Sequence, residues 1–325
     1  MSKFYWFLGH EAFQPEVLVR HAAKAEKAGF DGVMVSEHFQ PWVADVGASG
    51  FAFSTLGAIA QATKKVELMT AVTTPLYRYH PAVVAQAAAT IDRLSGGRFA
   101  LGIGNGEKIN EAPLGLNFPA YKERAARLTE AIEIMGPLLA GEKLSYDGEY
   151  YQTKDAKLYS PPIAKVPIFV AAGGPQTASL TGRMADGLIA SVKSPSQTLE
   201  QVINPAKAAA GPKAFTIITT HWSVYAQNND EAWQALKAWR GLRAPSRNEA
   251  TDPLVLQQEA DKMPREDILS RYDILQSAQA YINCYALLVK ALHADIVGFQ
   301  ATAVDQEALI AMVGNKVLPE LRKLN

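Results

Sequence analysis

A carboxylate, an imidazole and an indole lie close together in the segment SEHFQPW, residues 36–42, directly after a short apolar run. Imidazole exchanges protons near neutral pH, so His38 is suited to act as a general base. A lone histidine more often packs in a core, and Trp42 could equally be a packing residue. The position of the group at the end of an expected strand, together with the neighbouring Glu37, favours the catalytic interpretation.

A second candidate group lies in the glycine-rich segment GIGNGEKINE, residues 102–111. Its glycines lack Cβ atoms and would let a flat ligand approach the backbone, although a plain glycine-rich turn would have the same composition. The spacing is not the GxGxxG of dinucleotide-binding folds. Glu107 directly follows the last glycine, which makes it a candidate acid.

A third group follows the apolar run near residue 170, where Gly173 and Gly174 precede an expected helix. Backbone N–H groups at a helix start attract phosphate, whereas the alternative is a simple capped turn. Thr74, after another apolar run, is a candidate hydrogen-bonding residue. A metal site is not expected, because the six histidines show no HxH or HExxH spacing and Cys284 is the one cysteine.

The composition indicates a folded protein with a large core. The chain has 325 residues, is 48% hydrophobic, and has 32 basic and 32 acidic residues, giving a net charge of zero. This balance excludes intrinsic disorder and disfavours charge-driven binding to nucleic acid or membranes. The apolar runs are too short to span a bilayer, and the N-terminus does not resemble a signal peptide. We expect a cytoplasmic protein.

Short apolar runs alternate with longer amphipathic stretches along the whole chain, which predicts a (β/α)₈ barrel. The eight expected core strands are residues 4–8, 32–36, 66–72, 99–103, 166–171, 187–191, 215–224 and 296–300. We expect one domain over residues 1–325, with insertions near 104–118, 142–162 and 240–275. The polar stretch 240–251 is expected to be a loop. Because barrel sites lie at the C-terminal strand ends, the three groups above should meet at one mouth.

Four segments together resemble F420-dependent glucose-6-phosphate dehydrogenases, a branch of the bacterial-luciferase-like superfamily. Residues 36–42 are similar to the S-D-H-F-Q-P-W segment of that family, and GNGEKINE, residues 104–111, to G-T-G-E-A-x-N-E. RYHPAVVAQA, residues 78–87, resembles R-Y-N-P-A-V-I-A-Q-A, and VAAGGP, residues 170–175, also matches. The resemblance implies a (β/α)₈ barrel, a homodimer and the deazaflavin coenzyme F420 bound at the barrel mouth.

The resemblance also implies roles for individual residues. His38 matches the general base, Trp42 an aromatic residue that stabilises the intermediate, and Glu107 the acid near the deazaflavin. The family has Asp where this chain has Glu37. Ala71–Val72 matches a position where the family has a cis peptide bond. The positions that match cofactor contacts are Glu37, Ala71, Val72, Thr74, Asn110, Gly173 and Gly174.

The implied substrate is a sugar 6-phosphate, with glucose 6-phosphate as the first candidate. Ser191 stands where the family has a phosphate-binding Thr, and Lys193 matches a Lys when a one-residue gap is allowed. Arg247 replaces the second Lys, and Arg271 matches the Arg; their alternative role is solvated surface charge. Retained positive charge suits a dianionic phosphate.

The implied reaction moves a hydride from C1 of the sugar phosphate to C5 of F420 and yields a lactone. Three alternatives remain open at this point. They are an F420-dependent secondary alcohol dehydrogenase, an FMN-dependent luciferase-like monooxygenase, and a non-catalytic F420-binding protein.

Overall fold

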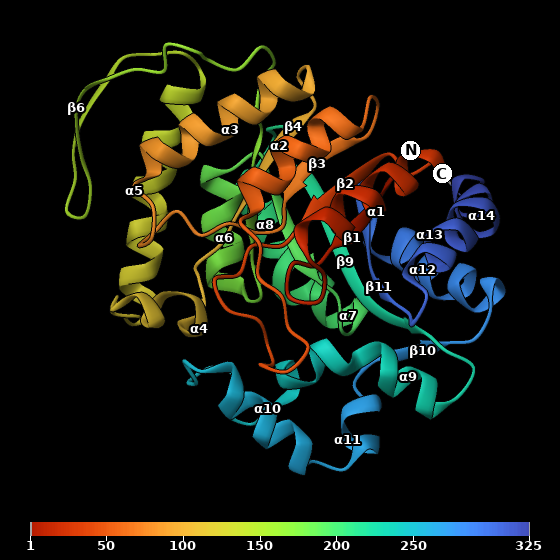
Figure 1. The fold of residues 1–325 in the computed structure, drawn as a ribbon. Helices are drawn as coiled ribbons and strands as arrows, with labels where there is room; N and C mark the ends of the chain where they lie inside the picture. The colour runs from red at the N-terminus through yellow and green to blue at the C-terminus, as the bar shows by residue number, and fades with distance from the viewer. Residues whose placement is uncertain (1, 325) are drawn as a thin grey trace.

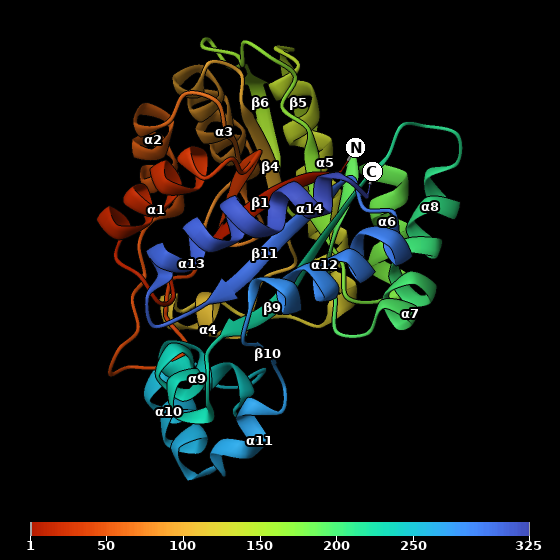
Figure 2. The same cartoon turned by 90° about the vertical axis from the view of Figure 1, so that its right-hand side faces the viewer.

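Eight parallel strands close into a barrel at the centre of the molecule (Figures 1 and 2). The structure is a computed structural model, and it describes residues 2–324. Each strand pairs with the next, and the last pairs with the first. In barrel order the strands are β1 (Lys3–Leu8), β2 (Gly32–Val35), β3 (Glu67–Thr70), β4 (Phe99–Ile103), β7 (Ile168–Ala171), β8 (Gly187–Ser191), β9 (Thr216–Tyr225) and β11 (Ile296–Thr302). The prediction of a (β/α)₈ barrel is confirmed.

The barrel strands are apolar on both faces because both faces are buried. In β1, Phe4, Trp6 and Leu8 belong to the core between the strands and the helices. The alternate residues, Tyr5 and Phe7, belong to a second core that includes the barrel interior. Because neither face is exposed to water, most of the strands appear in the sequence as apolar runs, although β9 also contains threonine, histidine and serine.

A layer of helices surrounds the barrel (Figure 1). Several start at a proline, which suits the first helical turn, and α3 is capped by His80, whose Nδ1 accepts a hydrogen bond from the Ala82 N–H. The helices that follow the barrel strands are α1 (Pro15–Lys27), α2 (Ala52–Ala62), α3 (Pro81–Ser95), α5 (Tyr121–Leu139), α6 (Pro175–Met184), α7 (Pro195–Thr198), α8 (Asn204–Ala210), α12 (Ala278–Leu292), α13 (Gln306–Met312) and α14 (Leu318–Arg322).

Three further segments extend from the barrel. The β4–α5 connection contains the short helix α4 (Lys108–Glu111) and a 3-10 turn, Ala112–Leu114. Strands β5 (Leu144–Asp147) and β6 (Gln152–Ala156) form an antiparallel hairpin. The connection after β9 contains α9 (Asn229–Leu236), a 3-10 helix (Lys237–Arg243), α10 (Pro253–Lys262), α11 (Arg265–Leu269) and β10 (Asp273–Leu275). Figure 2 shows α9, α10 and α11 beyond the C-terminal end of β9, whereas the hairpin lies at the opposite end.

The prediction of a loop over 240–251 is wrong at its start, because residues 237–243 form the 3-10 helix. Within it, Arg240 is buried, and its guanidinium contacts Asp45 Oδ2 at 2.8 Å and Asp261 Oδ1 at 2.6 Å. The pair with Asp45 fastens the insertion to the chain that follows β2, and the pair with Asp261 holds the 3-10 helix against α10 within the insertion. Local polarity predicted a loop because it could not show that Arg240 has distant acidic partners.

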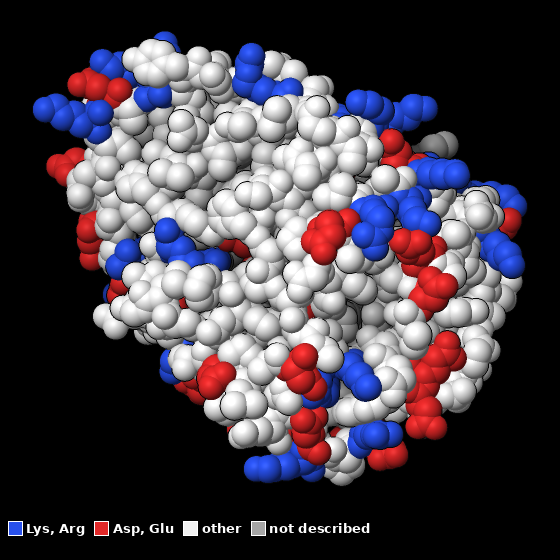
Figure 3. All heavy atoms as spheres, in the orientation of Figure 1, with Lys and Arg blue, Asp and Glu red and all other residues white. Residues whose placement is uncertain are grey.

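The surface has a mixed distribution of charge. Figure 3 shows acidic and basic side chains interspersed on the face that it draws, without a continuous basic region. That mixture is what a net charge of zero would give. Within residues 2–324, no helix combines the length and apolar character that crossing a bilayer requires.

Candidate active site

A cavity of about 1130 Å³ lies at the C-terminal ends of the barrel strands, beside the insertion that follows β9. Of the fourteen residues predicted for the site, thirteen line this cavity. The exception is Gly174, which lies one residue further on, at the N-cap position of α6. These thirteen residues come from six connections, those that contain or follow the ends of β2, β3, β4, β7, β8 and β9, as expected for a barrel whose site lies at the C-terminal strand ends.

The orientation of His38 is fixed by its neighbours. Its Nδ1 lies 3.1 Å from the carbonyl oxygen of Gln40, which can only accept, so Nδ1 carries the hydrogen in this bond. The indole of Trp42 packs edge-on against the imidazole, with ring centroids 4.8 Å apart. Nε2 is consequently the nitrogen that faces the acidic groups of the site.

Two carboxylates flank Nε2 of His38. Glu11 Oε1 lies 3.3 Å away and Glu107 Oε2 lies 3.4 Å away. Glu11 is buried, and its other oxygen accepts a hydrogen bond of 2.5 Å from the Ser36 hydroxyl. A protonated imidazole would be stabilised by both negative charges. This arrangement suits a group that accepts a proton and holds it.

The sequence analysis missed Glu11. It lies three residues after β1, so the same strand-end criterion that selected Glu37 and His38 applies to it. Its histidine neighbour, His10, is fully buried and bonds Ser36 O through Nδ1 and Thr55 Oγ1 through Nε2. Burial lowers the pKa of His10. His10 is therefore a structural support behind Glu11 and Ser36.

Glu107 also contacts the insertion. Its Oε1 lies 2.5 Å from Nη2 of Arg247, and the guanidinium of Arg247 lies 5.1 Å from the ring centroid of Trp42. A residue predicted to bind phosphate is thus ion-paired with the residue predicted to be the acid. The carboxylate has His38 on one oxygen and Arg247 on the other.

Glu37 lines the cavity and belongs to a cluster of buried polar side chains. Its carboxylate accepts hydrogen bonds from the hydroxyls of Thr73 and Tyr79. Arg78 lies between two acidic groups, 3.4 Å from Glu37 and 3.3 Å from Glu111. Burial raises the pKa of Glu37 although Arg78 opposes the shift, and burial raises the pKa of Glu111 to about 7. The oxygens of Glu37 are therefore occupied by donors of this chain.

The glycine-rich segment packs closely against the chain after β3. A Cβ atom on Gly102 would overlap the carbonyl oxygen of Thr70, and one on Gly104 would press on the side chain of Val72. Packing therefore accounts for two of the three glycines, and the third, Gly106, has a φ of 79°. The Ala71–Val72 peptide bond is cis, at the position where the family resemblance implies one.

Asn110 connects α4 to the loop that carries His38. Its Oδ1 accepts hydrogen bonds of 2.9 Å from the Phe39 N–H and 3.4 Å from the Gln40 N–H. Gln40 in turn provides the carbonyl that orients His38. Asn110 lines the cavity, but its side-chain oxygen is used to hold the loop that carries His38.

Four basic side chains line the cavity: Lys193, Arg243, Arg247 and Arg271. Ser191, at the end of β8, lines the same wall. Arg243 was not predicted; its guanidinium lies 4.3 Å from the ring centroid of Tyr272. The arginines of the stretch 240–251 were visible in the sequence, but nothing in their spacing distinguished Arg243, which faces the cavity, from Arg240, which does not line it.

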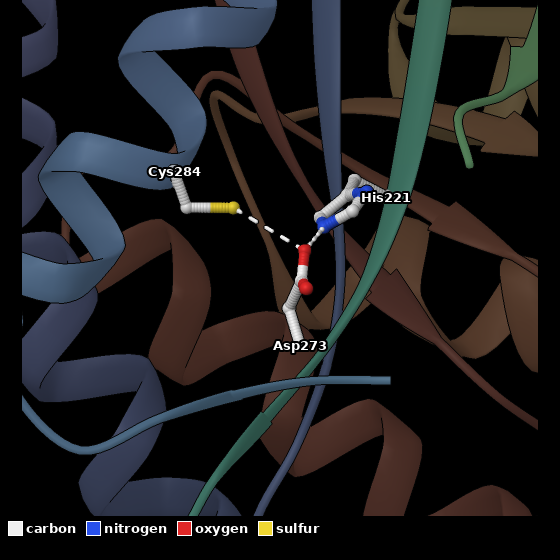
Figure 4. A group of neighbouring side chains, drawn as sticks. All are labelled: His221, Asp273 and Cys284. Atoms are coloured by element: carbon white, nitrogen blue, oxygen red, sulfur yellow. Dashed lines mark hydrogen bonds and ion pairs between the residues drawn. The ribbon is translucent and has the colours of Figure 1, made fainter. Parts of the chain in front are cut away.

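His221, Asp273 and Cys284 form a further polar group at the cavity (Figure 4). His221 Nδ1 lies 3.0 Å from Val192 O, and its Nε2 lies 2.7 Å from Asp273 Oδ2. The Cys284 sulfur lies 3.9 Å from the same oxygen. Two ligands of one tetrahedral zinc ion, at bonds of about 2.1 Å, would be about 3.4 Å apart, so the His–Asp spacing is that of a hydrogen bond.

The function of this group is to hold β10. Asp273 is the first residue of β10 and follows Arg271 closely, while His221 belongs to β9. Burial, followed by the charge of Asp273, raises the pKa of the Cys284 thiol to about 12, so the sulfur stays protonated. The hydrogen bond between His221 and Asp273 thus fixes the chain that carries Arg271 against the barrel.

A barrel with a base and two carboxylates at its C-terminal mouth defines a class of enzymes that act on small molecules. The chain belongs to the luciferase-like monooxygenase family, whose model matches residues 3–280. The resemblance identified from the sequence motifs is confirmed.

Named relatives narrow the comparison. The F420-dependent glucose-6-phosphate dehydrogenase of Nakamurella multipartita is 37% identical over 330 residues, covering 99% of this chain and 97% of that protein. The F420-dependent hydroxymycolic acid dehydrogenase of Mycobacterium tuberculosis is 36% identical, covering 97% of this chain and 87% of that protein. Among solved structures, an F420-dependent secondary alcohol dehydrogenase in complex with an F420–acetone adduct superposes with a TM-score of 0.89. It is 30% identical and covers 99% of this chain and 100% of that one.

Proposed function

We propose that this protein is an F420-dependent dehydrogenase that oxidises C1 of a sugar 6-phosphate, with glucose 6-phosphate as the first candidate. The sugar loses a hydride from C1 and the proton of its C1 hydroxyl, which leaves the lactone. One observation carries the proposal: His38, with Glu11 and Glu107 beside Nε2, shares a single cavity with four basic side chains. An acid–base group and an anion-binding wall together suit a phosphorylated alcohol.

The cavity wall fits a flat ring with polar edges. Asn105 Oδ1, in the glycine-rich segment, is buried and has no hydrogen-bond partner within residues 2–324. A buried acceptor of this kind needs a donor, and a deazaflavin ring offers an N–H. A Cβ built on Gly173 would meet nothing within 4 Å, so this part of the wall is open. When bound, coenzyme F420 supplies the hydride acceptor.

His38 accepts the hydroxyl proton at Nε2. The hydrogen bond from Nδ1 to Gln40 O leaves Nε2 as the basic nitrogen of the neutral ring. The ring becomes a cation on accepting the proton, and the two adjacent carboxylates lower the free energy of that state. Trp42, packed on His38, limits the movement of the imidazole.

The four basic side chains that line the cavity, called the basic wall below, bind the phosphate. Arg271 and Lys193 provide charge, Ser191 provides a hydroxyl, and Arg243 is a further cation that the family resemblance did not suggest. A guanidinium binds phosphate oxygens through a fork of N–H groups, whereas an ammonium acts as a point charge. The change from Lys to Arg at residue 247 therefore alters the geometry of the site and keeps its charge.

The experiment has two steps. The purified protein is titrated with F420, FMN and NADP, and the preferred cofactor is then assayed with glucose 6-phosphate, glucose and isopropanol. We expect F420 to bind and glucose 6-phosphate to give the highest kcat/KM. Preference for FMN would indicate a monooxygenase, and F420 binding without turnover of any substrate would indicate a binding protein; either result contradicts the proposal.

A secondary alcohol dehydrogenase is the second candidate, because the alcohol dehydrogenase structure superposes over the whole chain. The basic wall argues against it, since a neutral alcohol has no use for four cations. A higher kcat/KM for isopropanol than for glucose 6-phosphate would establish this alternative. Cytoplasmic location stays a prediction from the composition, and assembly into a homodimer stays a prediction from the family resemblance.

A further inference from the structure

Two ion pairs of alternating sign join the β4–α4 segment to the insertion after β9. Glu107 Oε1 pairs with Arg247 at 2.5 Å, and Lys108, the next residue, pairs with Glu249 at 2.9 Å. The first pair lines the cavity, while Glu249 of the second is largely exposed to solvent. The exposed pair contributes little to stability. The pair in the cavity involves a residue needed for the reaction.

Arg247 can contact more than one acceptor. One of its terminal nitrogens bonds Glu107, the other bonds Asn248 Oδ1 at 3.1 Å, and its Nε is buried without a hydrogen-bond partner within residues 2–324. About a third of the side chain is exposed. A dianion held by Lys193 and Arg271, which line the same cavity, would compete with the single negative charge of Glu107 for this guanidinium.

The charged groups around Glu107 determine how the loss of Arg247 from this carboxylate affects His38. His38 Nε2 faces one of its oxygens and Arg247 the other, and Lys108 is engaged by Glu249. Glu11 Oε1 lies 3.3 Å from the same Nε2. Arg247 neutralises part of the negative charge of Glu107, so a Glu107 released from Arg247 attracts the proton carried by His38 more strongly.

We propose that the substrate's phosphate draws Arg247 away from Glu107 and so frees Glu107 to take the proton that His38 removes from the hydroxyl. This inference rests on the proposed function. The proton moves from the substrate oxygen to His38 Nε2 and then to Glu107 Oε2, and no electrons change hands in this relay. A substrate without the anion leaves Glu107 paired with Arg247, which makes Arg247 a positioning residue as well as a binding residue.

The first test measures the rate at which the enzyme oxidises glucose, a substrate that lacks the phosphate. Arg247→Gln removes the cation from Glu107 permanently, so we expect this variant to oxidise glucose several-fold faster than the wild type. The same variant should have a KM for glucose 6-phosphate at least 10-fold higher. Added inorganic phosphate should accelerate glucose oxidation by the wild type and not by Arg247→Gln. A residue that only binds phosphate would leave the phosphate-free rate on glucose unchanged, and that result overturns the inference.

A second readout needs no coenzyme and no turnover. The probe is sulfate, a tetrahedral dianion that does not titrate near neutral pH. The heat of sulfate binding to the wild type is measured by calorimetry in two buffers that differ in their heat of ionisation. We expect proton uptake on binding, absent in Glu107→Gln and reduced in Arg247→Gln. Equal proton uptake in the wild type and Glu107→Gln overturns the inference.

The controls separate this inference from the proposed function. Arg247→Lys keeps the charge and should retain phosphate activation, while Arg265→Gln, which removes an exposed charge of the same insertion, should change nothing. If glucose 6-phosphate is oxidised but Arg247→Gln leaves glucose turnover unchanged, the inference alone fails. If glucose 6-phosphate is not oxidised at all, the proposed function fails.

Discussion

Glu11 Oε1 lies 3.3 Å from Nε2 of His38, so the predicted base has a buried carboxylate directly beside its reactive nitrogen. The other oxygen of Glu11 is held by Ser36, which belongs to the loop of His38 itself. Glu11 and His38 come from the loops after β1 and β2, two adjacent strands of the barrel. Glu11 and His38 therefore form a pair at the mouth of the barrel.

The first prediction concerns Glu11→Gln, which keeps the size of the side chain and removes its charge. We expect kcat to fall about 10- to 100-fold, because the protonated imidazole loses one of its two stabilising carboxylates. F420 affinity should change little. Steady-state kinetics and a fluorescence titration with F420 measure the two quantities, with Glu307→Gln on the surface as the control. A wild-type kcat would show that Glu11 only packs.

The second prediction concerns His38→Ala. General acid–base catalysis contributes about 10²–10⁴-fold, so kcat should fall by about that factor while F420 still binds. Single-turnover measurements with bound F420 separate the chemical step from product release. Equal turnover in the variant and the wild type would remove His38 from the mechanism.

The third prediction concerns the basic wall. Neutralising Arg247 and Arg271 together should raise KM for glucose 6-phosphate about 100-fold or more, because each charged hydrogen bond contributes about 1.5–3 kcal/mol. The dissociation constant for F420 should change far less. An unchanged KM would mean that the bound substrate carries no phosphate at this wall.

The fourth prediction concerns stability and pH. The pKa of Glu111 rises from its ordinary value of 4.5 to about 7 in the folded protein, mainly through burial. Between these two values the folded state binds more protons than the unfolded state, so stability falls as the pH rises from about 4.5 to about 7. The contribution is about 3 kcal/mol.

Glu111→Gln tests this prediction. Urea unfolding at pH 5 and pH 8 should show a smaller loss of stability between the two pH values in the variant than in the wild type. Glu26→Gln is the comparison, because backbone N–H groups lower the pKa of that partly buried carboxylate. An equal loss of stability in Glu111→Gln and the wild type would contradict the prediction.

The barrel was predictable from the sequence because both faces of its strands are buried. A run such as GVMV in β2 has no polar residue to break it, and all four residues are buried. β10 was not predicted, because its three residues pair only with one edge of β9 and are partly exposed. Helix α11, which was also missed, is only five residues long. Such short elements give no periodicity to detect.

The site was predictable where its residues follow a strand, and not where a partner comes from far along the chain. His38 and Glu107 stand next to apolar runs, so their placement at the mouth followed from the fold. The pairing of Arg247 with Glu107 joins residues 140 positions apart. Arg240 and Asp45 are 195 positions apart. Contacts over such separations depend on how the insertion folds back, which one sequence does not encode locally.

The β5–β6 hairpin lies at the end of the barrel opposite to the insertion helices (Figure 2). Its strands are mostly exposed and pair only with each other. A peptide tag or a surface anchor introduced on the exposed residues of the two strands would therefore immobilise the protein by the end that lies away from the insertion helices. Diffusion of small molecules into the mouth would be unaffected by the support.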